Sequence, residues 1–105
     1  MVSKTVEKDF DFRGKVAVIS GGSSGMGRAT ALELAQGGAD LVVSARRAEL
    51  LDSLAEEVRE MGHRCVTVPI DITAKGAPKS LIDKAIAEFG KINYLVNTTC
   101  YVRLN

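Results

Sequence analysis

The stretch KVAVISGGSSGMGRATALELAQGGA, residues 15–39, decides the fold of this chain. Its first part, KVAVIS at 15–20, is a short apolar run rich in β-branched residues, which is typical of a strand buried on both faces of a parallel sheet. A glycine cluster follows, and apolar residues then recur at helical spacing until a Gly-Gly pair ends the pattern. The stretch therefore predicts a strand, a tight turn and a helix.

The residues after this stretch continue the same alternation. Further strands are expected over 41–45, 64–70 and 92–97, because each is a short apolar run. Helices are expected between them, one over 48–61 with an apolar stripe and one that starts near Pro78. The order βαβαβαβ predicts the α/β class, with a parallel sheet that stops after its fourth strand.

Length and composition describe one ordinary globular domain. With 105 residues, 26% charged residues and a net charge of +1, the chain has no strong electrostatic bias, so nucleic acid is not an expected partner. No apolar run approaches the ~20 residues that span a bilayer, and the start of the chain lacks the apolar core of a signal peptide. We therefore expect a cytoplasmic protein without a membrane partner. We divide it into a polar lead (1–13), a βαβαβαβ half-domain (14–97) and a tail (98–105).

Three glycines in the first turn indicate a nucleotide site. Gly21, Gly25 and Gly27 form G-x-x-x-G-x-G, in which glycine permits a positive φ, a close backbone approach to a pyrophosphate and close packing of the helix. The helix amino terminus then faces the anion, and the absence of Gly-Lys-Ser/Thr disfavours a P-loop. The alternative is a glycine-rich turn without a ligand. The candidate dinucleotide-binding residues here are Ser20, Gly21, Ser23, Ser24, Gly25, Met26 and Gly27.

The segment SGGSSGMG after KVAVI resembles the T-G-x-x-x-G-x-G signature of the short-chain dehydrogenase/reductase family, with Ser20 at the usual Thr position. The resemblance implies a Rossmann-type sheet with helices on both faces and the strand order 3-2-1-4. It also implies that Asp71, with Ile72 beside it, contacts adenine, and that Asn97 adjoins the cofactor ribose. The alternatives are a loop aspartate that caps a turn and an asparagine that only ends a strand.

The end of the second predicted strand favours NADP(H) over NAD(H). Folds that bind NAD place an acidic residue there to hold the ribose 2′-hydroxyl, but this strand ends in Arg46 and Arg47. Asp40 precedes the strand and lies at the wrong end. Arg46 offers a planar set of donors to a 2′-phosphate. The alternative is a pair of solvated arginines at a helix start.

No catalytic or metal-binding residue is predicted. The resemblance implies catalysis by a Ser, a Tyr-x-x-x-Lys pair and a helix Asn beyond the fourth strand, yet Tyr94 precedes Thr98 and Tyr101 precedes Asn105 by four positions. The two cysteines lack the spacing of a redox or zinc site. We expect the NADP(H)-binding portion of an oxidoreductase, inactive as this chain. The alternatives are a non-catalytic nucleotide-binding module or pseudoenzyme, and another Rossmann enzyme such as an epimerase or dehydratase.

The expected strand order has a consequence for association. If nothing pairs with the fourth strand, residues 94–96 form an edge with unpaired backbone groups. This reasoning predicts marginal stability and self-association through the fourth strand, while the substrate is not visible in the sequence.

Overall fold

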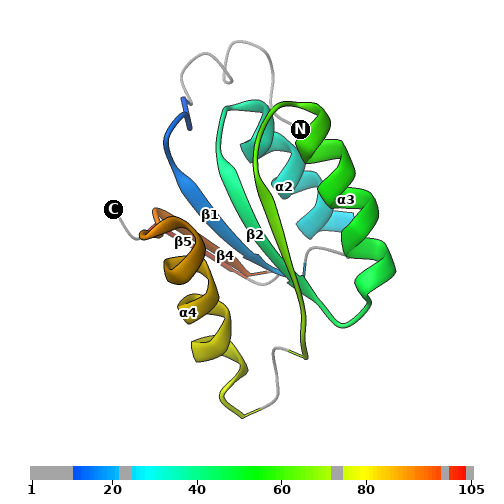
Figure 1. Cartoon of the computed structure of the whole chain (residues 1–105), viewed down its shortest axis with the longest axis vertical. Coiled ribbons are helices and arrows are strands. Elements are labelled where there is room, and N and C mark those ends of the chain that lie inside the picture. The colour runs from blue at the N-terminus through cyan, green and yellow to red at the C-terminus, as the bar shows by residue number, and fades with distance from the viewer. Residues whose placement is uncertain (1–10, 22–24, 72–74, 98–99, 104–105) are drawn as a thin grey trace.

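The computed structural model describes residues 11–21, 25–71, 75–97 and 100–103, and strands and helices alternate along them (Figure 1). The elements in chain order are β1 (Val16–Ser20), α2 (Gly25–Gln36), β2 (Asp40–Ala45), α3 (Ala48–Glu60), β3 (Cys65–Pro69), α4 (Ala77–Phe89), β4 (Tyr94–Asn97) and β5 (Cys100–Arg103). The predicted α/β class and the predicted alternation are confirmed.

The fourth strand starts later than its apolar pattern predicted. Asn93 is buried, and its side-chain Oδ1 accepts a hydrogen bond of 2.9 Å from the backbone N–H of Val16. Its own backbone N–H donates to the Val16 carbonyl at 2.8 Å. Asn93 therefore attaches the approach to β4 to the start of β1, and the regular strand begins at Tyr94.

The strands form one sheet in the order β3-β2-β1-β4-β5. β1 lies between β2 and β4 and is parallel to both, and β2 is parallel to β3. The order 3-2-1-4 implied by the family resemblance is therefore confirmed. Because these four strands run the same way, their carboxyl ends lie at one edge of the sheet.

The expectation of an unpaired fourth strand is wrong. β5 pairs with β4 in antiparallel register, with Leu95 opposite Val102 and Asn97 opposite Cys100. The segment Cys100–Arg103 contains Tyr101 and Val102, which are aromatic and β-branched residues that favour strands. An antiparallel partner needs only a short connection, so the backbone groups on this side of β4 are paired by the tail itself.

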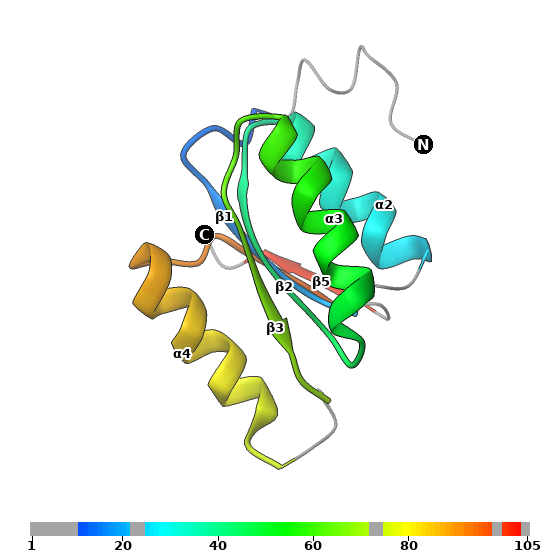
Figure 2. The same cartoon turned by 45° about the vertical axis from the view of Figure 1, so that its right-hand side comes forward.

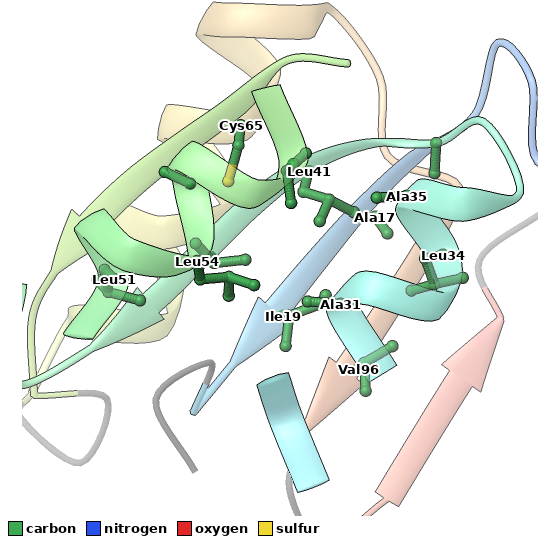
Figure 3. Packing of buried hydrophobic residues seen from close by; sticks show 14 of the residues in the cluster. Ala17, Ile19, Ala31, Leu34, Ala35, Leu41, Leu51, Leu54, Cys65 and Val96 are labelled. Atoms are coloured by element: carbon green, nitrogen blue, oxygen red, sulfur yellow. The ribbon is translucent and has the colours of Figure 1, made fainter. Parts of the chain in front are cut away.

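The helices cover the two faces of the sheet unequally (Figure 2). α2 and α3 pack on one face, and α4 packs on the other. On the first face, α3 buries Leu51, Leu54, Ala55 and Val58. The predicted apolar stripe was Leu50, Leu51, Leu54, Val58 and Met61; Leu50 is instead 42% exposed, and Met61 follows the last residue of the helix. The buried residues of α3 belong to one core cluster with Ile19 of β1 and Leu41 of β2, and Figure 3 labels Leu51, Leu54, Ile19 and Leu41 in it. The smaller cluster under α4 contains Val18, Val42, Leu81 and Ala85.

Small residues bring α2 close to β1. Gly27, Ala31 and Ala35 are buried along α2, and Ala31 and Ala35 belong to the same core cluster as Ala17 of β1. Small side chains at a helix–sheet contact let the helix pack close to the strand, so the amino end of α2 lies near the carboxyl end of β1. No helix in the described part of the chain is long and apolar enough to cross a membrane.

Candidate functional site

The carboxyl ends of the parallel strands form the candidate site. β1 ends at Ser20, β2 at Ala45, β3 at Pro69 and β4 at Asn97. The strand register places Ser20 opposite both Ser44 and Asn97, and Ala45 opposite Pro69. Open α/β sheets bind ligands at this edge, where the strand order reverses on either side of the first strand.

The turn after β1 has the backbone that the glycine pattern predicted. Gly21 has a φ of 85°, a value that side chains rarely permit, and its N–H donates a 2.9 Å hydrogen bond to the Ser44 carbonyl. Gly25 begins α2, and a Cβ added there would meet no atom within 4 Å. Packing within the described residues therefore gives no reason for glycine at position 25. Ser23 and Ser24 lie outside the described residues.

The amino end of α2 retains the positive end of its dipole. Its first turn contains no acidic residue, so no carboxylate of the helix competes for an incoming anion. Met26, in the same turn, is 70% exposed and offers apolar surface beside the loop. Arg28 forms an ion pair with Glu57 of α3, which ties this end of α2 to its neighbouring helix.

Polar residues form a row across the sheet at this edge. Ser20 and Ser44 are both buried, and Asn97 is exposed at the end of β4. The Ser44 hydroxyl has no hydrogen-bond partner among the residues that the structure describes, although the side chain is only 1% exposed. Ser44 is not among the site residues predicted from the sequence, because a serine inside the apolar run LVVSA does not by itself indicate a binding site.

Arg46 and Asp71, both predicted as cofactor contacts, lie together at the ends of β2 and β3. The Arg46 guanidinium donates from Nη2 to Oδ2 of Asp71 at 3.2 Å. Arg47 is also exposed and precedes the first residue of α3. Ile72 lies outside the described residues. No local sequence pattern predicts the ion pair, because its members are 25 positions apart.

Asp40 has a structural role, at the other end of β2. Its Oδ1 accepts a 2.9 Å hydrogen bond from the backbone N–H of Arg64, at the entry to β3. The prediction that Asp40 lies at the wrong end of the strand for a ribose contact is confirmed by its pairing with Val16, the first residue of β1.

Tyr94 and Cys65 lie at the amino ends of β4 and β3, away from the candidate site. Tyr94 is buried at the amino end of β4, with its ring edge-to-face with Phe12 at a centroid distance of 5.5 Å. Burial raises the pKa of the Cys65 thiol to about 11, so the thiol stays protonated near neutral pH. In the described ranges, no group of three or more His, Cys, Asp or Glu residues could hold a metal ion.

Comparison with known proteins agrees with this architecture. A family model described as short chain dehydrogenase matches residues 15–104. An uncharacterized oxidoreductase of Mycobacterium tuberculosis is 42% identical over 83 residues, which are 79% of this chain and 32% of that protein. The chain therefore spans about a third of the length of this relative.

Solved structures show the same similarity in three dimensions. L-sorbose reductase from Gluconobacter frateurii, complexed with NADPH and L-sorbose, superposes with a TM-score of 0.78 at 34% identity, over 83% of this chain and 34% of that one. Carveol dehydrogenase from Mycobacterium avium, in complex with NAD, gives 0.79 at 30% identity, over 89% of this chain and 38% of that one. With the glycine turn, the strand order and the family match in agreement, the chain belongs to the short-chain dehydrogenase/reductase family, of which it represents the amino-terminal part.

Proposed function

We propose that this chain is the NADP(H)-binding portion of a short-chain dehydrogenase/reductase oxidoreductase. The observation that carries the proposal is Gly25, where glycine is unexplained by packing in the described residues and is explained by a phosphate that approaches the backbone. When bound, the nicotinamide accepts or supplies a hydride, which in the whole protein is exchanged with an alcohol or carbonyl substrate.

The residues of the edge have separate proposed roles toward the dinucleotide. The amino end of α2 receives the pyrophosphate, where its free N–H groups and the absence of a first-turn carboxylate favour an anion. Asp71 contacts adenine, and Ser20 and Asn97 flank the ribose. Solved relatives hold either NADPH or NAD, so the general cofactor class follows from the family and the choice between the two depends on local residues.

The preference for NADP(H) depends on Arg46 in this proposal. Its side chain is 78% exposed at the end of β2, where a 2′-phosphate would lie, and its guanidinium supplies several donors in one plane. Arg47 is the second arginine of the pair, and it lies directly before the first residue of α3.

We expect the chain to bind NADPH more tightly than NADH, and Arg46→Ala to reduce that preference by about 10- to 100-fold, because charge-assisted hydrogen bonds to the phosphate are lost. Calorimetric titration of both nucleotides measures the ratio. Arg47→Ala should reduce the preference for NADPH less than Arg46→Ala does, and Lys84→Ala on α4 controls for the change in net charge. A preference that survives Arg46→Ala would contradict this role.

A second candidate function is nucleotide binding without turnover. The 105 residues contain no Tyr-x-x-x-Lys, and Tyr94 is buried at the amino end of β4, away from the candidate site. Under this proposal the chain holds a dinucleotide and supplies no proton donor for the carbonyl oxygen.

We therefore expect the purified chain not to oxidise NADPH faster than a protein-free control with a panel of aldehydes and ketones. General acid–base help is typically worth about 10²- to 10⁴-fold, and none is available here. Absorbance at the NADPH maximum follows the reaction. Turnover that persists after Tyr101→Phe and Tyr94→Phe would require a different catalyst, and turnover that either variant removes would identify a tyrosine that this proposal leaves unused.

A further inference from the structure

Asp71 brings a negative charge to the end of β2, where the sequence itself has only arginines. Its Oδ2 lies 3.2 Å from Nη2 of Arg46, and the pair is open to solvent, with the Asp71 side chain 38% exposed. The carboxylate comes from the segment that directly follows the neighbouring strand, β3.

The sheet order produces this contact. β2 and β3 are adjacent and parallel, and Ala45 is in register with Pro69. Arg46 follows Ala45 directly, and Asp71 lies two residues beyond Pro69, so both leave the sheet at the same edge. A contact that depends on two strand ends in register is a property of the fold.

We propose, on the basis of the proposed function, that Asp71 is a specificity-determining residue that limits the preference for a 2′-phosphate. With a nucleotide that has only a 2′-hydroxyl, Arg46 stays paired with Asp71. With a nucleotide that has a 2′-phosphate, Arg46 exchanges the carboxylate for the phosphate. An ion pair this exposed is held weakly, so the exchange is feasible.

Two physical effects of Asp71 act in the same direction. The carboxylate competes with the phosphate for the guanidinium, and it repels the phosphate through space. A 2′-hydroxyl carries no charge and experiences neither effect. Removal of the carboxylate charge therefore strengthens binding of the 2′-phosphorylated nucleotide relative to the other.

The probes are adenosine 5′-monophosphate and adenosine 2′,5′-bisphosphate, which differ only in the 2′-phosphate. Any contact of Asp71 with adenine affects both nucleotides and cancels in the ratio of their dissociation constants. Loss of fold also affects both. The ratio thus reports selectivity at the 2′ position, which a purely structural role of Asp71 would not change.

We expect Asp71→Asn to raise the ratio in favour of the bisphosphate by about 3- to 10-fold at low ionic strength, and the increase to shrink as salt is added. Asp71→Ala should act in the same direction. In an Arg46→Ala background the increase should be smaller, because competition for the guanidinium is gone and only repulsion remains. Asp52→Asn, an exposed carboxylate on α3, controls for net charge.

A ratio that falls in Asp71→Asn would show that Asp71 positions Arg46 for the phosphate, and it would overturn the proposal. A ratio that matches the Asp52→Asn control would overturn it as well. If neither nucleotide binds the wild-type chain, the proposed function itself fails. If both bind and only the ratio disagrees, the proposed function stands and this inference is wrong.

Discussion

Replacement of Gly25 by valine is expected to abolish dinucleotide binding and leave the fold in place. An added Cβ at this position meets no atom of the described chain within 4 Å. The same space is the proposed approach of the pyrophosphate to the amino end of α2. We expect the affinity for NADPH to fall at least about 100-fold, because steric exclusion removes several charge-assisted hydrogen bonds together.

Circular dichroism and thermal melting check the fold, and calorimetric titration checks binding. Gly25→Ala should retain the fold and lose part of the affinity. Gly90→Ala is the matched control. Because Gly90 has a φ of 76°, alanine is strained there, and the substitution should lower the free energy of unfolding by about 1 kcal/mol without weakening the binding of NADPH. Retained NADPH affinity in Gly25→Val would show that the phosphate lies elsewhere.

Removal of residues 100–105 is expected to convert a monomer into an associating protein. β5 satisfies backbone groups of β4 in the antiparallel pairing, and its loss exposes them as an open edge. With about 1 kcal/mol for each lost hydrogen bond, we expect a loss of about 2–4 kcal/mol and a fall in Tm on the order of 10 °C or more. The full chain should elute as a monomer.

Size-exclusion chromatography with light scattering at two concentrations, together with thermal melts, tests this expectation. Removal of only residues 104 and 105 leaves the β5 strand and serves as the control. A shortened chain that stays monomeric with an unchanged Tm would show that β5 contributes nothing to the edge. Saturating NADPH should raise the Tm of the full chain, because a ligand that binds only the folded state stabilises it.

Much of the fold could be predicted because its signals are local. The run VAVIS predicted β1, and the apolar stripe from Leu50 to Met61 predicted α3, since periodicity within an element reports which side is buried. β5 was missed because four residues, Cys100–Arg103, carry too weak a pattern by themselves. Their strand conformation depends on pairing with β4, which is a tertiary contact.

The sequence by itself determined the order of strands and helices from β1 to β4, and the glycine turn with its positive φ at Gly21, because these depend on neighbouring residues and on backbone sterics. Only the tertiary structure decided that Asp71 forms an ion pair with Arg46, that Ser44 is buried in a row of polar residues and that β4 pairs with β5. Each of these joins residues from different strands. Strand order and register set such contacts, and no local pattern of side chains encodes them.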